Sequence, residues 1–330
     1  MSLVERALKK IQESRAQVQP AHAPQGSLNT VPMPVARPTP TPQPSVTHSA
    51  PIVSAVPTLE PVARPTRVVH IDRDALRQAE LLPPASQERQ LSGEYRQIKR
   101  PLIANALGRG VPKLPNGHRI MIASAMPGDG KTFTSINLAL SFAMEKDLSV
   151  VLVDADVAKA HLSRTFGVHN ELGLMDLLRD EKLDVESAIL PTDVPGLSIL
   201  PAGKTHETAN ELLGSARMEQ IANQITVRYP NRIVLFDSSP LLITTEAMPL
   251  AAAVGQIVLV VRAGVTPQSA VLDAIELLGE GKSIGLVLNQ TDEQVRPGYY
   301  YQYYGHKDGD RSADTVDVDD GAVRRSVGDG

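Results

Sequence analysis

The chain has 330 residues, a formal net charge of −4 and no cysteine. The lack of cysteine excludes disulfide scaffolds, zinc ribbons and thiol nucleophiles, and it fits a cytoplasmic protein. The small negative charge gives no electrostatic argument for a nucleic-acid partner. No apolar run approaches the ~20 residues that a membrane-spanning helix needs.

The N-terminal quarter of the chain differs in composition from the rest. Of the 26 prolines, 14 lie within the first 84 residues. Residues 16–66 cannot bury enough apolar surface to offset the entropy of ordering, so we expect a disordered linker with polyproline II character. Residues 1–15 predict a short amphipathic helix with these apolar residues on one face: Leu3, Val4, Ala7, Leu8 and Ile11. A helix this short has marginal stability in isolation. The segment is therefore either a helix that frays or a docking peptide for a partner.

From residue 67 onward the sequence predicts a folded domain. Residues 67–110 form a charged, helix-forming lead-in. Predicted strands then follow at Arg119–Ser124, Ser149–Val153, Leu197–Leu200, Arg232–Phe236, Gln256–Val261 and Ile284–Leu288. Predicted helices alternate with them at Lys131–Met144, Leu172–Arg179, Ala209–Val227 and Thr266–Leu278. Continuously apolar strands that alternate with helices indicate an α/β fold, with a mostly parallel sheet, helices on both faces and ligands at the carboxyl ends of the strands.

The strongest motif follows the first predicted strand, where residues 125–132 read AMPGDGKT. It matches the phosphate-binding loop GxxxxGK[ST], except that Ala125 replaces the first glycine. In such a P-loop the glycines let backbone N–H groups approach phosphate oxygens, the lysine reaches the β- and γ-phosphates and the hydroxyl binds Mg²⁺. We therefore expect a P-loop NTPase-like ATP site. Its residues are Pro127, Gly128, Asp129, Gly130, Lys131, Thr132 and Phe133.

Three aspartates stand at the ends of two further strands, Asp154 and Asp156 in VLVDAD and Asp237 in IVLFDSSP. A carboxylate there is unfavourable unless it is paired or faces a cation, and Mg·ATP supplies that cation. Two carboxylates this close raise each other's pKa, so one of Asp154 and Asp156 serves as base and the other binds the metal. The spacing does not assign them. We therefore predict that Asp154, Asp156 and Lys131 are catalytic. The predicted metal ligands are Thr132, Asp156 and Asp237.

Five of the seven tyrosines lie within six residues of the C-terminal tail: Tyr299, Tyr300, Tyr301, Tyr303 and Tyr304. They follow the last predicted strand, where little core remains to pack against. About ten extended residues span at most ~35 Å, so the tail reaches its own or a neighbour's ATP site. A phospho-acceptor tail, an oligomerisation patch and an inert tail all fit this pattern.

These motifs resemble those of the bacterial tyrosine autokinases, a P-loop family of exopolysaccharide and capsule loci. SAMPGDGKT (Ser124–Thr132) corresponds to Walker A, VLVDAD (Val151–Asp156) to the family's Walker A′ and IVLFDSSP (Ile233–Pro240) to Walker B. The tyrosine cluster completes the set. Residues 67–295 then form the kinase domain and residues 296–330 a disordered tail. The segments SLVERALKK and HIDRDALRQAELLPP are similar to the branch associated with exosortase-type loci.

The resemblance implies that the γ-phosphoryl group of ATP passes, with Mg²⁺, to the clustered tyrosines of a neighbouring subunit, while a Walker A′ aspartate receives the phenolic proton. It implies regulation of exopolysaccharide synthesis or export and a homo-oligomeric ring. It also implies recruitment to the inner face of the cell membrane by a transmembrane polysaccharide co-polymerase or chain-length determinant. A cognate tyrosine phosphatase is compatible with this cycle.

The chain departs from the family at two places, and two other functions remain open. Ala158 and Ala160 replace the Arg and Pro that usually follow Walker A′. In the ring-forming ExxRxxR helix, Arg96 and Lys99 match, but Gly93 stands in place of Glu. One alternative is a MinD/ParA-like ATPase switch, which would carry a second lysine where this chain has Met126. The other is a nucleotide-binding scaffold without kinase activity.

Overall fold

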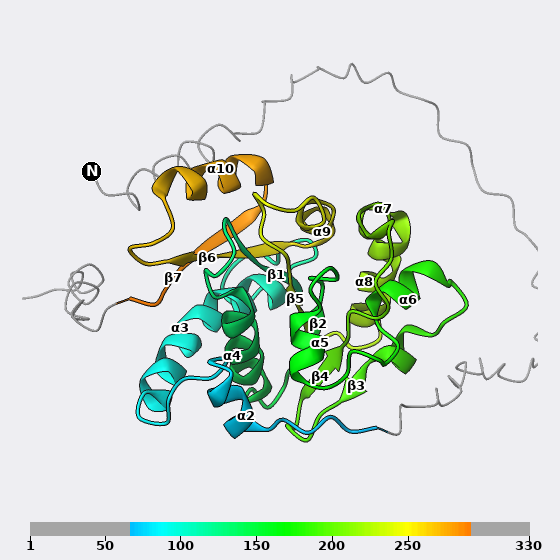
Figure 1. Ribbon diagram of the computed structural model, residues 1–330, viewed down its shortest axis with the longest axis horizontal. Helices are drawn as coiled ribbons and strands as arrows, with labels where there is room; N and C mark the ends of the chain where they lie inside the picture. The colour runs from blue at the N-terminus through cyan, green and yellow to red at the C-terminus, as the bar shows by residue number, and fades with distance from the viewer. Residues whose placement is uncertain (1–66, 292–330) are drawn as a thin grey trace, which may run out of the picture. The chain divides into compact units, whose positions relative to one another are not determined.

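In the computed structural model, which describes residues 67–291, a seven-stranded sheet has the strand order β3-β4-β2-β5-β1-β6-β7 (Figure 1). The strands are β1 (Arg119–Ser124), β2 (Ser149–Asp154), β3 (Leu190–Pro191), β4 (Leu197–Leu200), β5 (Arg232–Asp237), β6 (Gln256–Arg262) and β7 (Ser283–Asn289). Neighbouring strands are parallel except β3 and β4, which are antiparallel. The predicted α/β fold is confirmed. The amphipathic segment, the linker and the tyrosine cluster lie outside the described residues.

Helices cover both faces of the sheet (Figure 1). One face packs against α2 (Arg73–Gln78), α3 (Glu88–Leu107), α4 (Lys131–Ala143) and α5 (His161–Thr165). The other packs against α6 (Leu174–Arg179), the 3-10 helix η1 (Val185–Ala188), α7 (Ala209–Leu213), α8 (Ala216–Val227), α9 (Ala247–Ala253) and α10 (Gln268–Leu278). None of the helices between residues 67 and 291 is both long and apolar enough to cross a bilayer.

Strand β1 shows why the strands are continuously apolar. Its Ile120 and Ile122 belong to the core on the α4 side, whereas Met121 and Ala123 belong to the core on the α8 side. Because successive side chains of a strand point to opposite faces, both sets must be apolar when both faces are covered. The six predicted strands are all present, with ends that differ by one residue at most.

The fold has features that were not predicted, among them strand β3 and helices α5 and α9. The helix expected at Ala209–Val227 is divided into α7 and α8, because Ser215 adopts an extended backbone with φ −79° and ψ 159°. The lead-in also joins the sheet edge, where Val69 forms a parallel bridge with Thr192.

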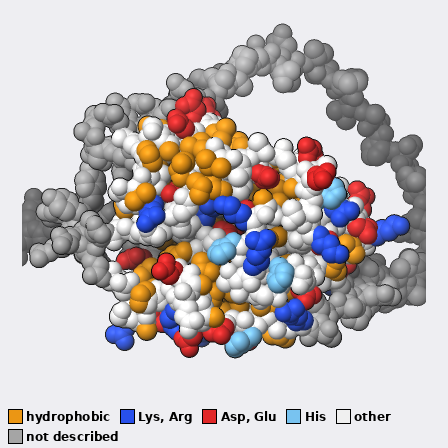
Figure 2. Space-filling view, viewed as in Figure 1, with side chains coloured by type: hydrophobic (Ala, Val, Ile, Leu, Met, Phe, Trp, Pro, Cys, Tyr) orange, Lys and Arg blue, Asp and Glu red, His pale blue; other side chains and the backbone are white. Residues whose placement is uncertain are grey.

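Hydrophobic side chains gather on the surface over α10, where Leu272 and Leu277 are partly exposed (Figure 2).

Candidate active site

The P-loop joins the carboxyl end of β1 to the first turn of α4. Gly128 and Gly130 have φ values of +82° and +95°, a conformation that other residues rarely adopt. A Cβ at Gly130 would also lie 2.0 Å from Nδ2 of Asn289, so glycine is required there for both conformation and space. Ala125 is fully buried and is not among the described residues with positive φ, so its replacement of the consensus glycine introduces no backbone strain.

Two distant segments hold the P-loop through Asp129. The Asp129 carboxylate is 2% exposed and accepts hydrogen bonds from the Met126 N–H at 3.1 Å and from Thr266 Oγ1 at 2.6 Å. Asn289, the last residue of β7, donates from Nδ2 to the Asp129 carbonyl oxygen at 3.0 Å. The Asp129 carboxylate is thus engaged within the protein, and the contact of this residue with nucleotide stays a prediction. The sequence did not predict Thr266 or Asn289, although Asn289 ends β7 and Thr266 follows the end of the neighbouring parallel strand β6.

The Lys131 side chain is buried among carboxylates at the start of α4. Burial lowers the pKa of its amine, while the charges of Asp237, Asp156 and Asp129 act in the opposite direction. The structure thus brings the predicted phosphate-binding lysine close to the predicted Walker A′ and Walker B carboxylates. A phosphate at this point would meet a cation that is already desolvated and oriented.

Asp237, at the end of β5, closes the base of the P-loop. Its Oδ2 accepts a hydrogen bond from Thr132 Oγ1 at 2.8 Å, and its Oδ1 accepts one from Ser135 Oγ at 2.9 Å. Burial, reinforced by the charge of Asp154, raises the pKa of the Asp237 carboxyl to about 7. Thr132 and Asp237 therefore lie together, as expected for residues that act on one metal ion.

Asp154 and Asp156, which the sequence could not distinguish, have different surroundings. Asp154 is opposite Asp237 in the register of β2 and β5 and is fully buried. Its Oδ2 accepts hydrogen bonds from Ser163 N and Oγ at 2.7 and 2.6 Å, while its Oδ1 has no partner among residues 67–291. Burial raises the pKa of Asp154 to about 6. Asp156 is only half-buried, and its Oδ1 accepts a weak bond from the Lys159 N–H at 3.3 Å.

The segment after Asp156 explains one departure from the family pattern. Ala160 has a φ of +46°. Proline fixes φ near −65°, so the proline that the family usually has at this position is incompatible with the local backbone. Ala158 and Lys159 are exposed beside it.

Lys99, one of the two residues that match the ring-forming helix, is engaged within the chain. It is 4% exposed, its Nζ donates to the Ser141 carbonyl oxygen at 2.6 Å, and it forms an ion pair with Glu145 at 2.7 Å. These contacts join α3 to α4. Of the two matching residues, only Arg96 is exposed for contact with another subunit.

The oxygen-rich end of the sheet fits a magnesium ion. The described residues contain no cluster of three or more His, Cys, Asp or Glu side chains that could hold a metal. Mg²⁺ on a nucleotide does not need one, because it takes phosphate and water oxygens together with one or two protein ligands. The hydroxyl of Thr132 and the carboxylate of Asp237 lie in mutual contact, and the unpartnered Oδ1 of Asp154 is a buried anionic oxygen without compensation.

Comparisons with known proteins agree with this geometry. The family model described as "AAA domain" matches residues 117–276. The tyrosine-protein kinase YwqD of Bacillus subtilis (strain 168) is 33% identical over 191 residues, which cover 57% of this chain and 78% of YwqD. CapB of Staphylococcus aureus, a protein named as a putative tyrosine-protein kinase, is 31% identical over 56% of this chain and 80% of its own length. The chain belongs to the bacterial tyrosine-protein kinase family.

The solved tyrosine kinase domain of BceF matches this bacterial tyrosine kinase with a TM-score of 0.53 and 27% identity, over 67% of this chain and 90% of that domain. The expected enzyme class, a tyrosine-protein kinase, is confirmed. The P-loop fold implies that the kinase binds ATP.

Proposed function

We propose that this kinase transfers the γ-phosphoryl group of ATP to tyrosines of its own C-terminal cluster. The observation that carries the proposal is the contact of Asn289 with the P-loop, through the carbonyl of Asp129. Tyr299 follows Asn289 by about ten residues, which span at most ~35 Å when extended. The chain therefore leaves the sheet at the phosphate site, close enough for the tyrosines to enter it in the same or a neighbouring chain.

The roles of the site residues follow from their positions. Lys131 would bind the β- and γ-phosphates, and Thr132 and Asp237 would hold Mg²⁺, with the Walker A′ carboxylates beside it. The metal ion would neutralise the charge of the phosphates. Phosphoryl transfer depends more on this neutralisation than on covalent chemistry by the protein. Asp156 is accessible and can accept the proton of an incoming phenol as well as contact hydrated Mg²⁺. Asp154 is enclosed, so it acts only on groups already inside the site.

We extend the proposal, on the family resemblance, to regulation of exopolysaccharide synthesis or export. Each phosphotyrosine adds about two negative charges, so several neighbouring ones would repel and loosen a homo-oligomeric ring. A transmembrane co-polymerase or chain-length determinant would recruit the kinase to the inner face of the membrane, and a phosphatase would reset the tail.

Mass spectrometry of the purified chain after incubation with Mg·ATP and the activating partner tests the proposal. We expect phosphate on Tyr299–Tyr304. Lys131→Met should abolish the signal, whereas Lys182→Met, at an exposed lysine outside the P-loop and Walker motifs, should leave it unchanged. Replacement of the five tyrosines by Phe should remove the signal but preserve ATP binding. Rapid ATP hydrolysis without phosphotyrosine would instead favour an ATPase switch.

A further inference from the structure

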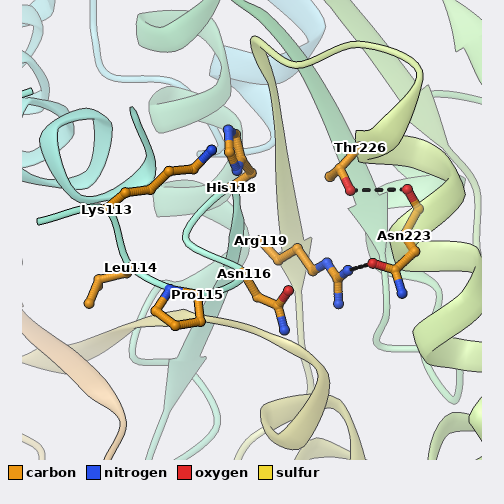
Figure 3. Close-up of a pocket in the computed structure, with 8 residues that line it drawn as sticks. All are labelled: Lys113, Leu114, Pro115, Asn116, His118, Arg119, Asn223 and Thr226. Carbon is orange, nitrogen blue, oxygen red and sulfur yellow. Dashed lines mark hydrogen bonds between the residues drawn. The ribbon is translucent and has the colours of Figure 1, made fainter. Parts of the chain in front are cut away.

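A pocket of about 330 Å³ opens at the amino end of the sheet, away from the P-loop (Figure 3). Arg119, the first residue of β1, lines it, whereas Ser124 at the other end of β1 leads into the P-loop. A strand rises ~3.3 Å per residue, so the two ends of β1 are roughly 17 Å apart. The pocket is thus separate from the nucleotide site.

The pocket has one basic wall and one apolar wall. Lys113, His118 and Arg119 supply the basic wall, and Leu114 and Pro115 the apolar one. Every other lining residue in the described part of the chain is neutral and polar, so no carboxylate faces the cavity. In Figure 3 the Lys113 amine and the His118 ring lie together on one side, and the Arg119 side chain extends across the pocket.

Arg119 is a buried cation without an ion-pair partner in residues 67–291. Its side chain is 2% exposed and donates to the Ala253 carbonyl oxygen at 3.1 Å and to the Asn223 Oδ1. Both acceptors are neutral. Burial lowers the pKa of the Arg119 guanidinium and the charge of Glu219 opposes this, but no ion pair joins the two within residues 67–291. Buried charges are normally paired, so this wall has a positive charge that no carboxylate of the described residues contacts.

His118 provides an independent indication. Its Nε2 is buried and has no hydrogen-bond partner among the described residues. Burial, then the charge of Lys113, and more weakly that of Arg119, lower the pKa of the imidazole, and the backbone of Pro230 partly opposes them. The ring is therefore neutral at pH 7 and faces an electropositive space. The charge of an anion placed there would favour the imidazolium form.

We propose that this pocket binds a phosphate monoester, whose phosphate contacts Lys113, His118 and Arg119 while its organic group packs on Leu114 and Pro115. A phosphotyrosine side chain and a free phosphorylated small molecule share this chemistry. The site itself does not depend on the proposed autophosphorylation, because its lining is complete within residues 113–226.

Titration of the chain saturated with Mg²⁺ and a non-hydrolysable ATP analogue tests the proposal, since the analogue also fills the γ-phosphate position and so keeps added phosphate out of the P-loop. Phenyl phosphate, inorganic phosphate and phenol are added separately, with calorimetry and the His118 ring resonances as readouts. We expect phenyl phosphate to bind, inorganic phosphate to bind more weakly, and phenol not to bind. Bound phenyl phosphate should raise the pKa of His118.

Two variants make the test specific. Lys113→Ala removes an exposed side chain, so it should leave the fold intact, as its melting temperature will show. It should weaken phenyl phosphate binding about tenfold, the effect of one lost charge-assisted hydrogen bond. Lys182→Ala should bind normally, and His118→Gln should bind with less dependence on pH.

A synthetic peptide of residues 296–305, phosphorylated on tyrosine, distinguishes the two sources of ligand. Tighter binding of the peptide than of phenyl phosphate identifies the tail as the source, and equal or weaker binding identifies a free phosphorylated molecule. Three results would overturn the proposal: unchanged His118 resonances at millimolar phenyl phosphate, equal affinity for inorganic phosphate, or equal affinity in Lys113→Ala.

Discussion

The Asp129 carboxylate shapes the P-loop from within the protein. Because it accepts hydrogen bonds from the Met126 N–H and the Thr266 hydroxyl, Asp129→Ala leaves two donors without an acceptor. The free energy of unfolding should fall by about 1–3 kcal/mol for unsatisfied buried groups of this kind. ATP should also bind more weakly, because the loop loses its contact with the Thr266 segment. Urea unfolding and calorimetry with ATP measure the two effects.

Asp129→Asn is the matched control for that substitution. It has the same shape and retains one carbonyl oxygen as an acceptor, so its loss of stability should be clearly smaller. An alanine variant that unfolds at the same urea concentration as the parent chain would show that the Asp129 contacts do not stabilise the loop.

The sequence predicted Lys131, Thr132 and Asp237 because the motif itself defines their positions around a phosphate and a metal. It could not predict Thr266 or Asn289. These residues meet Asp129 across 137 and 160 positions in the chain, and no local pattern encodes contacts of that range. Nor could it distinguish Asp154 from Asp156, because their difference depends on the burial that Ser163 and α5 create.

Among the elements, the central strands were predictable because burial on both faces requires uninterrupted apolar residues. The helical pattern of Ala209–Val227 continues across the break at Ser215, so periodicity alone could not separate α7 from α8. The two-residue strand β3 has no periodicity of its own. Its pairing with β4 and the bridge from Val69 position it, and both depend on the tertiary structure.

The contact between α3 and α4 depends on Lys99, which bonds to the Ser141 carbonyl oxygen and to Glu145. Lys99→Ala removes a buried aliphatic side chain and leaves the Ser141 carbonyl oxygen without the lysine amine as its donor. We expect a loss of about 2–4 kcal/mol in the free energy of unfolding, from lost packing and an unsatisfied acceptor together. Urea unfolding measures it.

Glu145→Gln separates the ion pair from the rest of the Lys99 contacts. Glu145 is partly exposed, so its charge should contribute less than about 1 kcal/mol. Equal losses in Lys99→Ala and Glu145→Gln would mean that the ion pair, rather than burial and the Ser141 bond, holds α3 on α4.

At the scale of the whole molecule, Asn289 contacts the P-loop, so under the proposed function about ten extended residues would suffice for Tyr299 to reach the site of its own chain or of a neighbour. The family resemblance implies transfer between subunits. This can be tested by mixing two full-length chains of different mass. One carries Lys131→Met and all its tyrosines, and the other is active but has Phe in place of the five clustered tyrosines.

Transfer between subunits should place phosphate on the Lys131→Met chain, at a rate that rises with the concentration of the active chain, because the two must associate before reaction. The matched control combines the Lys131→Met chain with a partner that carries both Lys131→Met and the five Phe substitutions, and it should give no signal. If the first mixture is also silent while the unmodified kinase phosphorylates itself under the same conditions, each tail serves its own site, and the reach of about ten residues from Asn289 is used within a single chain.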